Sequence, residues 1–539
     1  MLVLLLLLLL SFFSFDIDGI QERDATIQAI PDFRSPKRIG FSAVGGGSSH
    51  FYWVLEILQK LEDQGHDTFL FTRGACLNYA KDYPKVETQV VGGDLNMLEA
   101  GDTPKPFKNH LQHNKPNPHR FITGLMPVLL RNYSNEFLEY EQVIKHQKLD
   151  LMICDMFAFA CMDATVKANI PLVISSTLAY TSDARTSYVT NEIPSFYKPT
   201  TETASIYERL RYLFYKYYLV YKMKRLGLPA HQFQKQHGIP LTVNLHDGNV
   251  RGAFKLVNNM FGLEAARPLG PLVNMMGPIM KHKYDALTPE LDQFLNTHQR
   301  VAYVAFGQHA KPTNDDTIYL LESLIYCLEN DLLDGVIWAT SDRHPLPSVP
   351  SQYHPMILVT GWAPQFAILQ HPSTRLFVTH GGAASVHEAL FSKVPLFVFP
   401  FFGDQPLTAR MVQQLHLGDT IDTAGIQYTT HVRKELTHRM QHVLTDPSIQ
   451  HTVRHFGNAL QVQSLHSVQR GADLIEEVLF SAINGQLLHR QDVGYRIHWF
   501  KRYNTDLVLI LMTILGVVTW IVCKLMIRSL NSSYKVKTL

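Results

Sequence analysis

A histidine and two glycines that follow a short apolar run have the spacing that most clearly suggests chemistry. Leu376–Thr379 predicts a buried strand, His380, Gly381 and Gly382 come directly after it, and a helix is expected to begin near Ala383. The glycines permit a tight turn and a close approach of the backbone to a ligand. The unpaired amides and the positive dipole end of a helix favour anions. The sequence therefore predicts a site for a diphosphate at the start of this helix.

Three side chains around this turn have the chemistry that a nucleotide needs. Ser385 can add a hydroxyl to the anion site, and Glu388, three residues later on the same helical face, can accept hydrogen bonds from a ribose diol. Trp362 offers a flat face on which a base can stack. Each of these residues, taken alone, is also explained by an ordinary place in the core or in a turn.

Taken together over some forty positions, these residues resemble the signature of the UDP-dependent glycosyltransferases of family one, whose architecture of two Rossmann-like domains is called GT-B. The stretch begins at Gly361-Trp362-Ala363-Pro364-Gln365 and ends at Asp404-Gln405. The donor-binding residues that the resemblance implies are Gly307, Trp362, Gln365, His380, Gly382, Ser385, Glu388, Asp404 and Gln405.

The resemblance also implies a role for each of these positions. Trp362 and Gln365 would contact the uracil and ribose, the turn at His380 would hold the diphosphate, and Asp404 and Gln405 would bind hydroxyls of the transferred sugar. Gly307 would be the phosphate-side turn of the first donor-domain strand. The sequence departs from the family pattern at four positions, which leaves the finer phosphate contacts and the choice of donor open: Gln308, Ala384, Lys393 and Thr408.

The first half of the chain has its own histidine beside a glycine run. Gly45-Gly46-Gly47-Ser48-Ser49-His50 follows the first predicted strand, and apolar residues then recur at helical spacing. His50 is therefore expected at the entrance of a helix, at the carboxyl edge of a sheet. A dinucleotide site is the alternative, but the second strand ends at Arg73 without the acidic residue that would hold an NAD ribose, which leaves NADP open.

In this half the resemblance places the family's catalytic histidine on His50 and its catalytic aspartate on Asp155. It implies an inverting single displacement, in which neutral His50 takes a proton from an acceptor hydroxyl. Asp155 would fix the imidazole tautomer and stabilise the imidazolium. His380 and the helix amides would stabilise the departing UDP in place of a metal. No metal or cofactor is therefore expected, and the UDP-sugar is a co-substrate.

Short apolar runs that alternate with helical patterns predict an α/β fold with two doubly wound, Rossmann-like domains facing across a cleft. The strand candidates are Arg38–Val44, Thr68–Thr72, Leu151–Cys154, Leu172–Ser175, Val301–Phe306, Val336–Ala339, Ile357–Thr360, Leu376–Thr379 and Leu396–Phe399. The segment Gly270–Pro289 is interpreted as the linker. The expected divisions are a signal peptide (1–16), an acceptor-binding domain (36–280), a UDP-sugar-binding domain (281–485), a juxtamembrane segment (486–506), a transmembrane helix (507–527) and a cytosolic tail (528–539).

The two ends predict a luminal enzyme with one membrane anchor. The leucine-rich start resembles a signal peptide, and an uncleaved anchor remains the alternative. Leu507–Cys523 is long and apolar enough to span a bilayer, and the basic residues after it place the tail in the cytosol. The ending Lys535-Val536-Lys537-Thr538-Leu539 resembles a dilysine signal for the endoplasmic reticulum. Asn132-Tyr133-Ser134 is then a candidate glycan acceptor.

The composition and one amphipathic segment limit the kinds of partner that the chain is expected to bind. The 539 residues include 49 lysines and arginines and 47 aspartates and glutamates, a net charge of +2 that gives no support for binding nucleic acid. The five scattered cysteines argue against a zinc ribbon or a disulfide scaffold. Ile206–Leu226 is basic and aromatic at helical spacing, so it either packs on its own domain, rests on a membrane or walls an acceptor pocket.

The acceptor expected from the resemblance is a small lipophilic hydroxyl compound that enters from the bilayer, and the transferred hexose is glucose or glucuronic acid. Two alternatives remain, a UDP-sugar epimerase of similar fold and a catalytically silent UDP-binding subunit. Homo-oligomerisation is left open.

Overall fold

The computed structural model describes residues 35–45, 47–93, 118–179, 181–190, 199–239, 252–340, 349–423, 426–495 and 497–536. The chain separates into two compact units, Met1–Pro36 and Lys37–Leu539, and the fold described below is that of the second unit. The predicted signal peptide lies outside the described residues.

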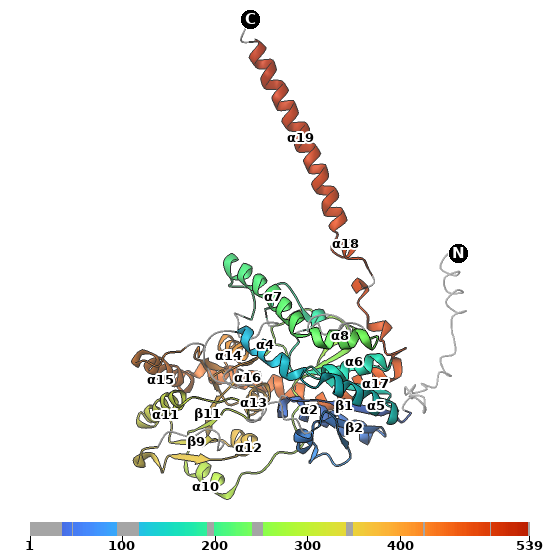
Figure 1. The fold of residues 1–539 in the computed structure, drawn as a ribbon. Coiled ribbons are helices and arrows are strands. Elements are labelled where there is room, and N and C mark those ends of the chain that lie inside the picture. The colour runs from blue at the N-terminus through green and yellow to red at the C-terminus, as the bar shows by residue number, and fades with distance from the viewer. Residues whose placement is uncertain are drawn as a thin grey trace, which may run out of the picture. The chain divides into compact units, whose positions relative to one another are not determined.

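Two parallel β-sheets organise the fold (Figure 1). The first has the strand order β3-β2-β1-β4-β5-β6-β7 and the second has the order β10-β9-β8-β11-β12-β13, and every neighbouring pair is parallel. The strands are β1 (Arg38–Ser42), β2 (Asp67–Thr72), β3 (Glu87–Val90), β4 (Leu151–Asp155), β5 (Leu172–Ser176), β6 (Phe254–Val257), β7 (Val273–Met275), β8 (Val301–Ala305), β9 (Gly335–Ala339), β10 (Ile357–Thr360), β11 (Thr374–Thr379), β12 (Leu396–Val398) and β13 (Gly418–Thr420).

All nine strands predicted from apolar runs are present, and the α/β class with two parallel sheets is confirmed. Four further strands, β3, β6, β7 and β13, have three or four residues each, and β3, β7 and β13 lie at sheet edges. The interpretation of Gly270–Pro289 as a linker is wrong for its first part, because Val273–Met275 pairs with β6 as the last strand of the first sheet.

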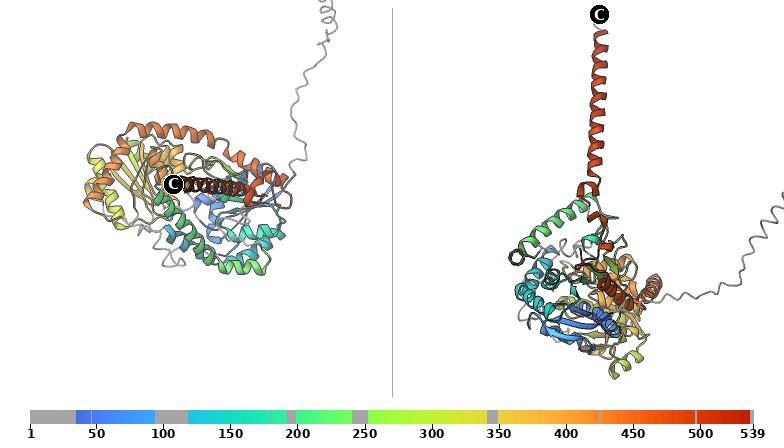
Figure 2. Two further views of the ribbon diagram at one scale, coloured as in Figure 1. Left: turned by 90° about the horizontal axis from the view of Figure 1, so that it is seen from above. Right: turned by 90° about the vertical axis from the view of Figure 1, so that its right-hand side faces the viewer.

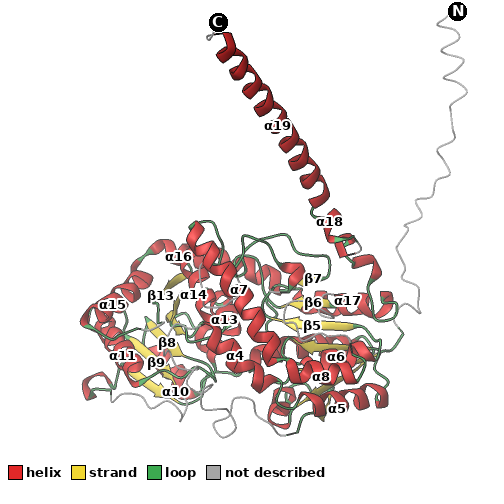
Figure 3. Ribbon diagram, turned by 45° about the horizontal axis from the view of Figure 1, so that its top comes forward, coloured by secondary structure: helices red, strands yellow, loops and turns green. Residues whose placement is uncertain are grey.

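Helices cover both faces of each sheet (Figure 3). The α-helices are α2 (Tyr52–Asp63), α4 (Pro118–Leu129), α5 (Tyr133–His146), α6 (Phe159–Lys167), α7 (Ile206–Leu226), α8 (Leu228–Gln236), α10 (Pro289–Thr297), α11 (Asn314–Glu329), α12 (Gln365–Gln370), α13 (Ala383–Phe391), α14 (Gln405–Gln414), α15 (Thr430–Thr445), α16 (Pro447–Ser464), α17 (Ser467–Ser481), α18 (Trp499–Arg502) and α19 (Thr505–Val536). Local signals set several starts: Thr313 and Asp316 form a capping box for α11.

The chain returns to the first sheet after it has built the second. Helix α16 contacts α13 of the second half, whereas α17 contacts α2 of the first half. In the left view of Figure 2, the orange helices pass from the yellow half of the fold to the blue half. Ala472, Ile475 and Val478 of α17 are buried in the same cluster as the apolar face of α2. The sequence assigned α17 to the UDP-sugar-binding domain, and the domain boundaries stay a prediction.

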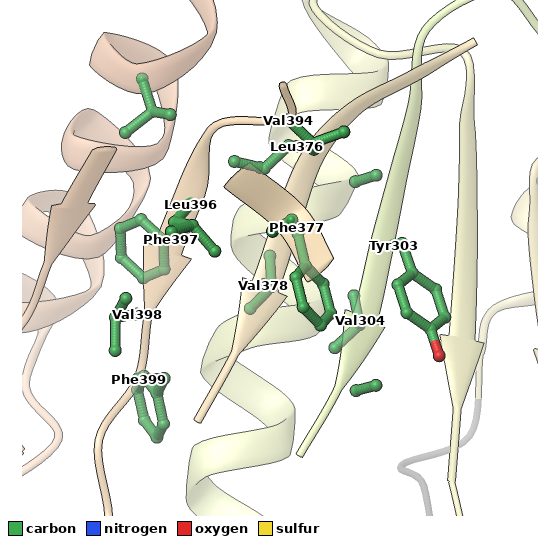
Figure 4. Close-up of a cluster of buried hydrophobic side chains, with 14 of the residues drawn as sticks. Tyr303, Val304, Leu376, Phe377, Val378, Val394, Leu396, Phe397, Val398 and Phe399 are labelled. Carbon is green, nitrogen blue, oxygen red and sulfur yellow. The ribbon is translucent and has the colours of Figure 1, made fainter. Parts of the chain in front are cut away.

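The strands of the second half are apolar where they are buried, and polar residues follow where they leave the core. Tyr303, Val304, Phe377, Val378 and Phe397 are fully or almost fully buried between the sheet and its helices (Figure 4). Burial on both faces requires near-continuous apolar strands, which is the pattern read from the sequence. Polar residues such as His380 follow where the strands leave this core, so they lie at its edge.

Among the described residues, one helix is long and apolar enough to cross a membrane, judged by length and composition: Thr505–Arg528, within α19. It agrees with the predicted span, and none of it is buried against the rest of the chain.

Helix α7 has the predicted bounds and contacts α4 and α8, but most of its aromatic residues are exposed. Phe214 is 69% and Tyr217 66% exposed, and only Leu219 and Met223 of this helix are buried.

Candidate active site

Each predicted catalytic or phosphate-binding histidine follows one of the two central strands of a sheet. The strand order reverses between β1 and β4 in the first sheet and between β8 and β11 in the second. Ligands of doubly wound sheets bind at such reversals, outside the carboxyl ends of the strands. His50 lies shortly after β1 and Asp155 ends β4, while Gly307 lies shortly after β8 and His380 directly after β11. Both sheets therefore present their predicted site residues at the expected point.

His50 and Asp155 form a buried pair. His50 ends a short 3-10 helix, η2 (Ser48–His50), and its Nδ1 lies 2.7 Å from Asp155 Oδ2. The two side chains are 11% and 2% exposed. Burial alone would lower the pKa of His50, but the carboxylates of Asp155 and Asp404 outweigh it and raise this pKa above its ordinary value. With Nδ1 donating to Asp155, Nε2 is left to accept a proton.

The loop after β4 holds the His50 ring from a second side. Phe157 stacks on the imidazole with the ring centroids 5.2 Å apart, and its amide donates to Asp155 Oδ1 at 3.0 Å. A disulfide between Cys154 and Cys161 closes this loop. The scattered spacing of the cysteines argued against a disulfide scaffold and did not indicate this single bond. Seven residues separate the two cysteines, and the turn from β4 into α6 brings them together. One disulfide thus brackets both residues that contact the His50 ring.

The turn that the sequence predicts as a diphosphate site lies between β11 and α13. Helix α13 begins at Ala383 as expected, and Gly381 has φ +83°, a left-handed conformation where a Cβ would lie 2.6 Å from Val398 Cγ1. A Cβ on Gly382 would lie 2.4 Å from His380 Nε2, so the imidazole rests directly on this backbone. Burial, with the neighbouring His309, lowers the pKa of His380 to about 4. His380 is therefore neutral at pH 7 and offers an anion a neutral N–H donor.

Gln365, Ser385 and Glu388 lie together, although twenty residues separate the first two. Gln365 Nε2 donates to Ser385 Oγ at 3.2 Å and to Glu388 Oε2 at 2.6 Å. Trp362 is 73% exposed, so its face is open to a stacking partner. Trp362, Gln365 and Glu388 all line one cleft, which is described below.

Asp404 and Gln405 start α14, but their side chains differ in availability. Asp404 is half-buried, and burial raises its pKa. Its charge reaches His50, which places it on the catalytic side. Gln405 is buried, and its Oε1 accepts the amides of Phe401 and Phe402 at 2.9 and 3.1 Å. The side-chain carbonyl of Gln405 therefore stabilises the turn after β12, and the side-chain NH₂ group remains available to bind a ligand.

A cleft of about 940 Å³ lies between the two halves, and four of the nine predicted donor-binding residues line it: Gly307, Trp362, Gln365 and Glu388. Gly47 and Ser48, which precede His50, line it from the first half, and Gly307, Trp362 and Glu388 line it from the second. The Tyr79 hydroxyl donates to Gln308 Oε1 across it at 3.1 Å.

The element that ends at His50 also contacts the helix that follows His380, because η2 contacts α13. The two candidate histidines thus lie next to elements that meet.

The surroundings of Arg73 argue against the NADP alternative. Arg73 is buried, and its guanidinium is paired with Glu136 at 2.5 Å. A guanidinium in a buried ion pair is not available to a ribose phosphate.

Lys281 and Tyr284 are among the residues of the cleft that the sequence did not indicate. Both lie in the segment interpreted as linker, where prolines and glycines mask any functional signal. No group of three or more histidine, cysteine or acidic side chains that could hold a metal ion occurs in the part of the chain that the structure describes.

Comparison with known families covers nearly the whole chain. Residues 47–538 match the model of the family described as UDP-glucoronosyl and UDP-glucosyl transferase. The chain belongs to this family. It is therefore a UDP-sugar-dependent glycosyltransferase, as the resemblance predicted, and the family's activity favours transfer over the epimerase and silent-subunit alternatives.

Individual members of the UDP-glycosyltransferase family agree with this assignment. The chain is 30% identical to UDP-glycosyltransferase 1 of Phaeomoniella chlamydospora over 425 residues, which cover 74% of this chain and 85% of that protein. It is 24% identical to UDP-glucuronosyltransferase 3A1 of Bos taurus over 505 residues, covering 91% and 92% of the two chains.

Solved structures of glycosyltransferases share the GT-B fold with this chain. The glycotransferase of kitacinnamycin has a TM-score of 0.59 at 19% identity, covering 82% of this chain and 99% of that one. A UDP-glucosyltransferase from Polygonum tinctorium has a TM-score of 0.57 at 17% identity, covering 83% and 99%. The predicted pair of Rossmann-like domains is therefore the architecture of this family member.

Proposed function

We propose that this enzyme is an inverting hexosyltransferase that moves glucose or glucuronic acid from a UDP-sugar to a hydroxyl of a small lipophilic acceptor. The observation that carries the proposal is the 2.7 Å contact between His50 Nδ1 and Asp155 Oδ2. His50 ends η2, and η2 contacts α13. Asp155 holds His50 in the tautomer whose Nε2 accepts a proton. His50 then acts as general base while the acceptor oxygen attacks the anomeric carbon.

The second half supplies the leaving-group side of the reaction. The diphosphate binds at the start of α13, where the amides of the first turn and the neutral His380 ring donate hydrogen bonds. Trp362 stacks on uracil, Glu388 accepts the ribose hydroxyls, and Asp404 with the amide of Gln405 binds the sugar. The attacking oxygen forms its bond to the anomeric carbon as the bond to UDP breaks, and His50 retains the proton. The neutral His380 ring and the α13 amides stabilise the negative charge of the departing UDP, and the step needs no metal.

The acceptor and the membrane belong to the same proposal. Helix α7 exposes aromatic side chains such as Phe214 and Tyr217 between basic residues, a composition suited to the headgroup region of a bilayer. With α19 as a single anchor, the catalytic halves face the lumen of the endoplasmic reticulum, the tail lies in the cytosol, and Asn132 is a luminal glycan acceptor. A lipophilic alcohol or phenol would then partition from the bilayer into the cleft.

A matrix of UDP-sugars against lipophilic phenols, sterols and water-soluble sugars tests the function. The full-length enzyme is assayed in vesicles, and the readouts are released UDP and product mass. We expect UDP-glucose or UDP-glucuronic acid to react with lipophilic hydroxyl compounds with inversion at the anomeric carbon. Conversion of the UDP-sugar without an acceptor, or retention of configuration, would overturn the proposal.

A further inference from the structure

The segment that connects the halves forms a third wall of the cleft. Lys281 and Tyr284 lie between β7 and α10, and both line the cleft together with Trp362 and Glu388. Neither residue belongs to a strand or helix. Their side chains are held in the cleft by contacts to both halves.

Lys281 is fastened to the first half. Its Nζ lies 4.2 Å from the centroid of the Tyr52 ring and 3.8 Å from Asp82 Oδ2, and the side chain is 19% exposed. The next residue, His282, contacts Glu56 of α2 through its backbone amide at 3.0 Å and its Nδ1 at 2.9 Å. These contacts fix the position of the Lys281 ammonium group in the cleft.

Tyr284 is fastened to the second half. Its ring stacks on Phe366 of α12 with the centroids 4.0 Å apart, and the residue before Phe366, Gln365, donates to Glu388 Oε2 at 2.6 Å. The Tyr284 hydroxyl accepts the amide of Lys281 at 3.3 Å. A chain of contacts therefore leads from the first half through this segment to the side chain predicted to hold the ribose.

We propose that Lys281 and Tyr284 are positioning residues of the donor site, which orient the Glu388 carboxyl so that it accepts both ribose hydroxyls. This inference rests on the ribose-binding role of Glu388 in the proposed function. A carboxylate accepts two hydrogen bonds from a diol, whereas a protonated carboxyl has lost part of that capacity. The connecting segment is thereby part of nucleotide recognition.

The charge balance around Glu388 shows why it needs such support. Burial raises the pKa of Glu388 to about 7, while the Gln365 amide, the Lys281 ammonium and the Tyr284 hydroxyl each act to lower it. Tyr303 of β8 also lies within the electrostatic reach of this carboxyl. Loss of either the ammonium or the hydroxyl raises the pKa further, so a larger fraction of Glu388 is protonated at neutral pH.

The test is the dissociation constant of UDP, measured by titration calorimetry on the full-length enzyme from pH 5.5 to 9. The variants are Lys281→Met, Tyr284→Phe and Glu388→Gln. The matched control is Lys283→Met, an exposed lysine of the same segment. We expect the first two variants to bind UDP about three- to tenfold more weakly at pH 7, with the pH midpoint of binding moved upward and most of the affinity recovered at pH 9. The control should match the wild type.

Two results would count against different parts of the argument. Wild-type affinity of Lys281→Met and Tyr284→Phe at pH 7, or a loss of the same size at every pH, would overturn the role of these two residues. A wild-type pH profile in Glu388→Gln would instead remove Glu388 from ribose binding. Because the phenylalanine variant keeps the stacked ring, an unchanged thermal unfolding midpoint separates a local effect from misfolding.

Discussion

The exchange Asp155→Asn tests whether the Asp155 carboxylate supports His50 as the general base. An amide at this position keeps the size of the side chain but removes the charge that faces His50 Nδ1 at 2.7 Å. Two unit charges about 4 Å apart, as between ring and carboxylate centres, attract by about 4 kcal/mol at the effective dielectric of about 20 that suits partly buried pairs. This attraction is gained only once His50 has taken the proton. Since about 1.4 kcal/mol corresponds to a tenfold change in rate, the loss predicts a fall in kcat of about a thousandfold.

The pH dependence gives the same variant a second readout. His50 must be neutral to accept a proton, so turnover falls as the pH drops through its pKa. Asp155 raises this pKa, hence the acid limb of the kcat profile should move to lower pH in Asp155→Asn. The assay is UDP release at saturating donor and acceptor from pH 5 to 9, with UDP affinity as a check on folding.

Asp150→Asn is the matched control for that experiment. Asp150 lies just before the opposite end of the same strand, where its Oδ2 accepts the Arg38 amide at 2.9 Å. Its exchange should leave kcat and the pH profile unchanged. Turnover of Asp155→Asn within tenfold of the wild type, or an acid limb that does not move, would refute the general-base assignment.

Three further predictions concern the loop, a helix end and the membrane-facing helix. Alanine at both Cys154 and Cys161 should lower kcat about tenfold with UDP affinity unchanged, because the loop around the His50 ring loses its closure; a wild-type kcat would contradict this. Lys393→Gly should stabilise the protein by about 1 kcal/mol in urea unfolding, because Lys393 has φ +60° at the end of α13, and a lower urea midpoint would count against it. Serine at Phe214 and Tyr217 should slow transfer to an acceptor dissolved in vesicles but not to a water-soluble acceptor, and equal losses for both would argue against membrane contact.

The parts of the fold that were predictable are those whose signal is local. An apolar run such as Leu376–Thr379 must be buried on both faces, and the glycines after it fix the turn before α13. The strands that were missed have weak local signals. Val273–Met275 has three residues among prolines and glycines, and Gly418–Thr420 carries an aspartate, so each forms a strand because a neighbouring strand is there to pair with it.

The site divides in the same way. His50 and His380 were identified from sequence because both follow central strands, whose carboxyl ends meet the ligand in this class of sheet. Phe157 and Tyr284 contact the site through stacking partners that are remote in sequence, and no spacing rule indicates such contacts. Gln405 shows the opposite case: it follows β12 as the sequence predicts, but only the structure shows its side-chain carbonyl turned to the amides of Phe401 and Phe402.

A crystal structure of the enzyme with an intact UDP-sugar analogue and an acceptor would test most directly how the two halves share the reaction. We predict a pyrophosphate on the first turn of α13 beside His380, with the anomeric carbon on the side of His50 and an acceptor oxygen within hydrogen-bond distance of His50 Nε2. A nucleotide bound elsewhere, or a sugar directed away from His50, would contradict the account.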